Sequence, residues 1–265
     1  MLKLSDVAKT FKIDANPLND RKALQGVSLT IKDDDFVTII GGNGSGKTTL
    51  LNIIAGVYDV DRGRIFIDSI DITDVKEYKR AKYIGRVFQD PMLGTIADMT
   101  LMENLALANH RGKRQSLSWA LTSSKREYFH ELLKTVDLGL EDRLDSRTRT
   151  FSGGQRQSIT LLMASMNSPR LLLLDEHTAA LDPKTAKKVM ELTSKIVEKL
   201  KIPTLMITHN MKDAIKYGNR LIMMADGKIV FESSGKEKAK LTVEDLVEKF
   251  SKVSGEELPD SMILS

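Results

Sequence analysis

Residues 36–56 read Phe36-Val-Thr-Ile-Ile-Gly-Gly-Asn-Gly-Ser-Gly-Lys-Thr-Thr-Leu-Leu-Asn-Ile-Ile-Ala-Gly56, and this stretch decides the fold. Its first five residues form an apolar, β-branched run, which is typical of a strand buried on both faces of a parallel sheet. From Lys47 to Ala55 the apolar residues recur at helical spacing, and Gly56 follows as a helix stop. The stretch therefore predicts a buried strand, a glycine-rich loop and a helix in direct succession.

The loop between this strand and this helix has the pattern of a glycine, four residues, and then Gly46-Lys47-Thr48. Such a loop binds phosphate, because glycines let the backbone curl around the anion with its N–H groups pointing inward. The start of the helix adds the positive end of its dipole. We expect Lys47 to reach the β- and γ-phosphates of ATP and Thr48 to ligate Mg²⁺. The predicted binding residues of the loop are Gly41, Gly42, Asn43, Gly44, Ser45, Gly46, Lys47, Thr48 and Thr49.

A second motif, Leu171-Leu-Leu-Leu-Asp175-Glu176, is an apolar strand that ends in two acids. Doubly wound sheets place ligand-binding groups at the carboxyl edge of such strands. We expect Asp175 to hold Mg²⁺, usually through water, and Glu176 to polarise an attacking water molecule. Taken alone, the motif would favour two solvated acids at a strand end. The phosphate loop upstream favours the functional interpretation.

Strand and helix patterns alternate along the rest of the chain, except for a mostly helical section between Pro91 and Asn167. This order indicates an α/β core interrupted by a helical insert. Asp226-Gly227 predicts a hairpin between two strands, and a helix is expected over 243–253. Further strands are expected at 27–31, 64–67, 83–88, 171–174, 204–207, 221–225 and 228–233, and further helices at 100–108, 119–136, 153–166, 183–200 and 211–217.

A third motif, Phe151-Ser-Gly-Gly-Gln155, stands just before one of these helical patterns. It resembles the Leu-Ser-Gly-Gly-Gln signature of ABC ATPases, and the chain from about residue 2 to residue 234 resembles the nucleotide-binding subunit of an ABC transporter. On this resemblance the family's other motifs are a Q-loop at Gln89, a D-loop at Asp182, a switch histidine at His209 and an adenine-stacking aromatic at Phe11.

The resemblance implies a P-loop NTPase core of mostly parallel sheet, with an antiparallel β subdomain and an inserted α-helical subdomain. The ATP-binding domain would span residues 1–234 and its helical subdomain about 91–167. Residues 235–265 would form a C-terminal helical tail.

The same resemblance implies a homodimer, or a pseudo-dimer, whose subunits lie head to tail around two MgATP. The Ser152 hydroxyl and the amides of Gly153 and Gly154 stand at a helix start and suit a γ-phosphate. In the family these groups, with Gln155, contact the ATP that the opposite subunit holds. The implied metal ligands are Thr48, Gln89 and Asp175, and the implied catalytic residues are Lys47, Glu176 and His209.

The chain departs from the common family pattern without losing a catalytic group. Phe151 replaces the usual Leu, His177 stands where Pro is usual, and Ala179 stands where Ser often opens the D-loop. The run from Glu176 to Asp182 resembles a bacterial subgroup that pairs with branched-chain-type permeases and a surface lipoprotein, and that is often assigned to aromatic amino-acid uptake. The implied partners are therefore integral membrane permease subunits and a solute-binding lipoprotein.

Composition narrows the class of partner. The 265 residues carry 40 basic against 36 acidic side chains, and the densest basic cluster, Arg111-Gly-Lys-Arg114, is short. Nucleic-acid binders concentrate positive charge in a stripe, so nucleic acid is not an expected partner. The absence of cysteine excludes a disulfide framework and a thiolate metal site. No apolar run approaches the ~20 residues that cross a bilayer. We therefore expect a peripheral protein at the cytoplasmic face of the membrane, held there by a permease.

Two other functions share this site chemistry. The ATPase of an ABC exporter would differ only in its partner, and a soluble ABC ATPase of cofactor assembly would have no permease. The segment 110–124, which includes Trp119, is longer than usual and is either a permease contact or a solvated elaboration. Asp98, Met99 and Thr100 fall where the family forms a groove for the permease's coupling helix.

Overall fold

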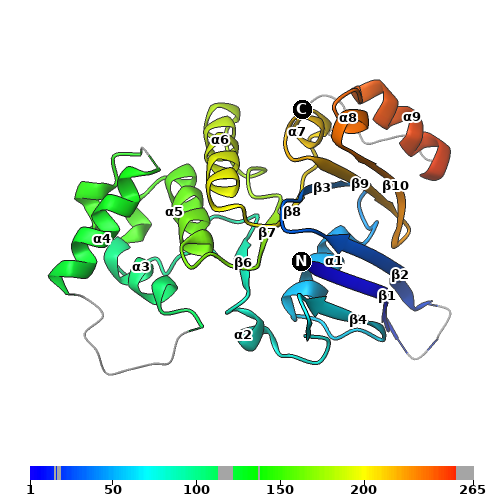
Figure 1. Cartoon of the computed structure of the whole chain (residues 1–265), viewed down its shortest axis with the longest axis horizontal. Helices are drawn as coiled ribbons and strands as arrows, with labels where there is room; N and C mark the ends of the chain where they lie inside the picture. The colour runs from blue at the N-terminus through cyan, green and yellow to red at the C-terminus, as the bar shows by residue number, and fades with distance from the viewer. Residues whose placement is uncertain (15, 17–18, 113–121, 137, 255–265) are drawn as a thin grey trace.

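A computed structural model of the chain describes residues 1–14, 16, 19–112, 122–136 and 138–254. The strands of its central sheet are β3 (Phe36–Ile40), β6 (Ile84–Val87), β7 (Leu171–Asp175), β8 (Thr204–Ile207), β9 (Arg220–Ala225) and β10 (Lys228–Ser234). Their order is β10-β9-β3-β8-β7-β6, and every neighbouring pair is parallel except the β9–β10 hairpin. This architecture confirms the expected α/β fold with a mostly parallel sheet (Figure 1).

A second, antiparallel sheet lies beside the central one. Its strands are β1 (Leu2–Phe11), β2 (Arg21–Ile31), β4 (Arg62–Ile67) and β5 (Ile70–Asp71), in the order β2-β1-β4-β5. Strand β2 begins well before the alternating pattern that predicted residues 27–31. The cause is its backbone pairing with β1, which continues to the register pair Phe11–Arg21. Cross-strand hydrogen bonds, rather than local side-chain alternation, set its length.

Helix α1 (Lys47–Ala55) is enclosed between the two sheets, where Figure 1 shows it (label α1). Its side chains Leu50, Leu51, Ile53 and Ile54 have no exposed surface. They belong to one core cluster with residues of β1, β2 and β4 on one side and β3, β7, β8 and β9 on the other. A helix whose apolar side chains cover a broad arc needs contacts on more than one side to bury them. The phosphate loop that precedes α1 is thereby fixed to both sheets.

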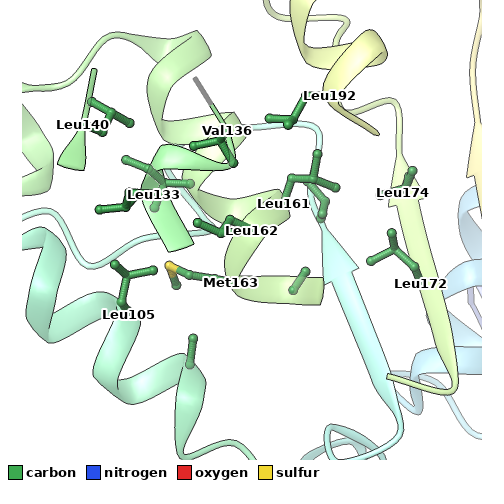
Figure 2. Close-up of a cluster of buried hydrophobic side chains, with 14 of the residues drawn as sticks. Leu105, Leu133, Val136, Leu140, Leu161, Leu162, Met163, Leu172, Leu174 and Leu192 are labelled. Carbon is green, nitrogen blue, oxygen red and sulfur yellow. The ribbon is translucent and has the colours of Figure 1, made fainter. Parts of the chain in front are cut away.

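On the other side of the central sheet, α5 (Gly153–Ser165) packs against β6, and α6 (Pro183–Leu200) packs against α5. The helices α3 (Leu101–Asn109) and α4 (Ser123–Lys134) lie beyond α5, farther from the strands, and all four helices contribute to one apolar cluster (Figure 1). Along β7, Leu172 and Leu174 face this helical cluster (Figure 2), and Leu171 and Leu173 join the cluster around α1. The four successive leucines therefore serve a strand covered on both faces. Of the helix expected at 119–136, α4 is described, whereas residues 119–121 and most of the 110–124 segment lie outside the described residues.

The C-terminal elements pack on the β9–β10 side of the sheet. They are α7 (Met211–Lys216), α8 (Gly235–Lys238) and α9 (Val243–Ser254). Elsewhere in the chain, a short helix, α2 (Glu77–Arg80), precedes β6. On α9, Leu246 and Phe250 are buried in a cluster with Ile40 and Met223. The Phe250 ring lies 3.1 Å from the position that a Cβ on Gly42 would take. The tail helix therefore lies against the phosphate loop.

His177 is an ionisable residue inside the core, next to the end of β7. It is 1% exposed, and its Nε2 lies 3.0 Å from the Thr193 hydroxyl. That hydroxyl donates to the carbonyl of Val189, so it accepts from an Nε2–H of His177. Burial lowers the pKa of His177 to about 4. The folded chain therefore holds this imidazole neutral.

This burial predicts a specific loss of stability in acid. Above pH ~6.5 His177 is neutral in both folded and unfolded chains, whereas below it the unfolded chain binds the proton first, so the free energy of unfolding falls. From the two pKa values, His177 alone should remove about 2 kcal/mol by pH ~5. Denaturant unfolding of the wild type and of His177→Gln between these pH values measures the difference.

The matched control is His130→Gln, because His130 is a partly exposed histidine on α4. It should keep the pH dependence of the wild type. The same dependence in His177→Gln would show that another group causes it.

Candidate nucleotide-binding site

The glycine-rich loop after β3 is shaped by close contacts on its outer side. Gly41 and Gly46 have φ values of +151° and +100°, which L side chains rarely adopt. A Cβ on Gly41 would lie 2.2 Å from the carbonyl oxygen of Met224, and one on Gly46 would lie 2.5 Å from that of Ala23. Both β9 and β2 therefore touch the loop backbone, and only glycine fits at these two positions.

Lys47, the first residue of α1, has its side chain inside the curl of the loop. It is 5% exposed, and its Nζ donates to the carbonyls of Gly41 and Gly42 at 2.8 and 2.9 Å. Burial lowers the pKa of Lys47, while the nearby carboxylates of Glu176 and Asp175 act in the opposite direction. The ammonium is thus held at the point where the loop and the two acids meet.

The Ser45 hydroxyl supports a polar ligand in this loop. Among the described residues, it is buried without a hydrogen-bond partner. A buried hydroxyl of this kind needs an additional donor or acceptor. A phosphate oxygen would supply it, so the loop fits a nucleotide polyphosphate.

A hollow of about 250 Å³ opens at the loop and brings together residues from distant parts of the chain. The phosphate loop, Glu176, His209 and Phe11 all line it, and Phe11 also packs edge-on against Tyr58 with ring centroids 5.1 Å apart. Its complete lining is Phe11, Arg21, Ala23, Asn43, Gly44, Gly46, Lys47, Thr48, Thr49, Glu176 and His209.

Glu176 and His209 form an ion pair or hydrogen bond at the edge of this hollow, with Oε1 and Nε2 2.6 Å apart. Glu176 directly follows β7 and His209 stands just after β8, so the two neighbouring parallel strands bring them to one edge. The Glu176 backbone has φ +47°, and its N–H donates to the carbonyl of Ile207 at 3.1 Å. A carboxylate held in this way can accept a proton from water, and the imidazole can orient it.

Asp175 lies beside Glu176 and is mostly buried. Burial raises the pKa of Asp175, while Arg86, whose Nη2 lies 3.7 Å from its Oδ2, and Lys47 act in the opposite direction. Arg86 also donates to the side-chain oxygen of Asn52 at 2.6 Å, which fixes the guanidinium. Arg86 was not selected from the sequence, because it lies on β6 and its partner Asp175 lies on β7, far away in the chain.

The oxygen donors near Lys47 suit Mg²⁺, which prefers carboxylate, hydroxyl and phosphate oxygens. Within the described part of the chain, no group of three or more His, Asp or Glu side chains is arranged so that it could hold a metal ion by itself. An Mg²⁺ held by the Thr48 hydroxyl and Asp175 would therefore take most of its ligands from phosphate and water. The third predicted ligand, Gln89, has an exposed side chain and does not line the hollow.

The signature residues and Asp182 form a second group away from this hollow. Ser152 caps α5, where its hydroxyl accepts from the N–H of Gln155 at 3.3 Å and its own N–H donates to Gln155 Oε1 at 3.0 Å. Asp182 caps α6 and accepts from the N–H of Thr185. A Cβ on Gly154 would lie 2.1 Å from Thr185 Cγ2, so the starts of α5 and α6 adjoin. Ser152, Gly153 and Asp182 are exposed.

Arg21 lines the hollow, although the sequence pattern did not select it. It is the register partner of Phe11, and its Nη2 lies 2.6 Å from the position of a Cβ on Gly44. Among the described residues, no carboxylate pairs with this guanidinium. In the sequence, Arg21 is a single positive charge at the start of β2, and single positive charges of this kind are common on protein surfaces.

Arg21→Ala is expected to weaken nucleotide binding by roughly three- to ten-fold, because a partly solvated charged contact contributes about 1 kcal/mol. Titration with a fluorescent ATP analogue measures the affinity, and the loss should shrink at high salt. Lys22→Ala is the matched control, since Lys22 is the next exposed cation on β2 and does not line the hollow. Equal effects of the two substitutions would remove Arg21 from the site.

Comparison with known proteins places these features in one family. The sequence model of the ABC transporter family matches residues 24–179. The chain is 49% identical to the tyrosine transport ATP-binding protein of Clostridioides difficile (strain R20291), over 94% of this chain and 98% of that protein.

Solved structures agree with the sequence comparison. A dimeric, post-hydrolysis structure of the ATP-binding cassette MJ0796 with ADP and Pi is 34% identical, with a TM-score of 0.75 over 88% of this chain and 98% of that one. The ADP conformation of MJ1267, an ATP-binding cassette of an ABC transporter, is 28% identical, with a TM-score of 0.77 over 94% of this chain and 98% of that one. The chain therefore belongs to the ABC transporter family, as an ATP-binding and ATP-hydrolysing subunit.

Proposed function

We propose that this ABC ATPase powers the uptake of an aromatic amino acid, most specifically tyrosine. The observation that carries the proposal is the 49% identity to a tyrosine transport ATP-binding protein, because the match covers nearly the full length of both chains. The run from Glu176 to Asp182, which resembles a subgroup assigned to aromatic amino-acid uptake, supports the same solute class. The solute itself would be chosen by other subunits, and this chain would supply the energy.

The active unit in this proposal is a head-to-tail pair of chains. One chain carries the phosphate loop, Glu176 and His209 around its hollow, whereas its own Ser152 and Gly153 are exposed elsewhere. A helix N-terminus with free amides is suited to an anion that another molecule presents. Closure of Ser152 over the ATP of a second copy would complete each site. The structural neighbour MJ0796 is dimeric in its ADP- and Pi-bound structure, which supports a two-chain unit.

Hydrolysis would follow from groups that already lie together in one chain. Glu176 would accept a proton from the attacking water, and His209, 2.6 Å away, would hold that carboxylate and the γ-phosphate in place. Lys47 and the loop amides would stabilise the charge that spreads over the phosphoryl oxygens. Bound Mg²⁺ would neutralise part of that charge, with Thr48, Asp175 and Gln89 as its proposed protein ligands.

A permease partner is supported by an apolar surface on the helical side. Leu93, Ile96 and Leu107 are 67%, 49% and 52% exposed, and they line a hollow of about 330 Å³ together with Asn104 and Met163. Asp98 lies next to this surface and pairs with Arg149 at 3.2 Å. No helix in the described ranges has the length and apolarity to cross a bilayer. We infer that a permease anchors this chain at the cytoplasmic face, within a system that includes a solute-binding lipoprotein.

Replacement of Glu176 by Gln tests the catalytic assignment. The variant should bind ATP as the wild type does, while turnover falls on the order of 10²- to 10⁴-fold, because the general base is lost. With MgATP, this variant should form dimers by light scattering, since the bridging ATP is no longer consumed. Glu127→Gln, on the exposed face of α4, is the matched control and should retain turnover. Normal turnover in Glu176→Gln would reject the assignment.

Transport measurements test the solute. Cells that lack this chain should lose most of their high-affinity uptake of labelled tyrosine, and complementation by the wild type, but not by Glu176→Gln, should restore it. Competition by phenylalanine and by leucine defines the solute class. Unchanged tyrosine uptake, with loss of uptake of another solute, would overturn the aromatic assignment and leave the ATPase function intact.

A further inference from the structure

Gln157 is a fully buried amide on α5, one and a half turns after the Ser152 cap. Its Nε2 donates to two backbone carbonyls, that of Phe88 at 2.8 Å and that of His177 at 2.7 Å. The Phe88 carbonyl belongs to the peptide unit that joins Phe88 to Gln89, and His177 directly follows Glu176. One side chain thus holds the backbone next to two residues assigned to the site.

The acceptor end of the same amide is unsatisfied. Among the described residues, Gln157 Oε1 is buried without a hydrogen-bond partner. A buried, unpaired acceptor is unfavourable, so packing alone would favour an apolar side chain at this position. What the glutamine gains over an apolar residue is its pair of donated hydrogen bonds.

The backbone that Gln157 holds is constrained on its other side as well. The His177 ring is anchored to Thr193 on α6, and Glu176 has a left-handed φ of +47°. A non-glycine residue keeps such a conformation only when its surroundings over-determine it. The His177 peptide, fixed through its ring and through its carbonyl, supplies that constraint on the carboxyl side of Glu176.

We propose that Gln157 is a positioning residue that couples the signature helix α5 to Glu176 and Gln89 of the same chain. The inference rests on the proposed roles of these residues and of Ser152. A helix is rigid over the ~8 Å between Ser152 and Gln157, so a shift of α5 toward a second copy's nucleotide also moves the Gln157 amide. The backbone at Phe88 and at His177, which is hydrogen-bonded to this amide, would then move with it. Engagement of the signature and placement of the general base are then linked by one amide.

Gln157→Met in the full-length chain tests the proposal, since methionine is of similar length and has no N–H donor. Turnover at saturating MgATP should fall roughly ten- to a hundred-fold, because a small misplacement of the base is costly. Affinity for a fluorescent ATP analogue should stay within about two-fold, since the phosphate loop is untouched. Turnover within about two-fold of the wild type would overturn the proposal.

Ser165→Ala is the matched control for stability. Ser165 is also buried on α5, but within the part of the chain that the structure describes its hydroxyl donates only to the carbonyls of Leu161 and Leu162 in its own helix. It should cost stability without lowering turnover. If Ser165→Ala reduces turnover as much as Gln157→Met at equal loss of thermal stability, the effect is structural and the proposal fails.

Gln157→Glu provides a second, independent readout. Burial raises the pKa of a glutamate, and only its protonated form can donate a hydrogen bond. The turnover of this variant relative to wild type should therefore rise as the pH is lowered from about 8 to about 6. A ratio that stays constant would count against the coupling.

Glu176→Gln, measured in parallel, separates the two levels of inference. Full turnover in that variant would reject the proposed catalytic roles as a whole. An inactive Glu176→Gln beside a fully active Gln157→Met would reject the coupling alone.

Discussion

The parallel pairing of β3, β8 and β7 is the constraint on which the rest of the site depends. Parallel strands end at the same edge of a sheet, so the loops after these three strands converge. Lys47, Glu176 and His209 meet there although they are far apart in the sequence. Burial of α1 between the two sheets fixes the phosphate loop against that edge, and the buried ammonium is offset by two carbonyls and two nearby carboxylates.

The helical side of the molecule presents a different chemistry from the sheet edge. Its exposed polar groups include the cap of α5 at Ser152 and the cap of α6 at Asp182, and neither lines the hollow of its own chain. In the proposed head-to-tail pair, hydrolysis would depend on assembly, because each chain would lack the groups that the other copy brings. The proposed permease surface lies on the same helical side, so the permease and the second copy of the chain would both contact this part of the molecule.

Buried side chains hold the loops at the carboxyl edge of the sheet, where Glu176 and His209 lie. His177, which stands where the family usually has proline, is neutral and anchored in the core, and Gln157 holds the same peptide from α5. On the other side, Phe250 of the tail helix packs against Gly42. The loops that would contact nucleotide therefore pack against buried side chains that do not line the hollow. Through Gln157, a small shift of α5 would change the position of the loop that carries Glu176.

The sequence by itself determined the strand–loop–helix unit at 36–56, the α/β fold and the family signalled by Phe151–Gln155, all of which are confirmed. These features follow from local physics: hydrophobic period, glycine conformation and short motifs that each bind one kind of group. Only the tertiary structure decided which side chains meet across the chain. The full length of β2, the place of Arg21 in the hollow and the two bonds of Gln157 depend on contacts between segments far apart in sequence, where side-chain pattern carries no signal.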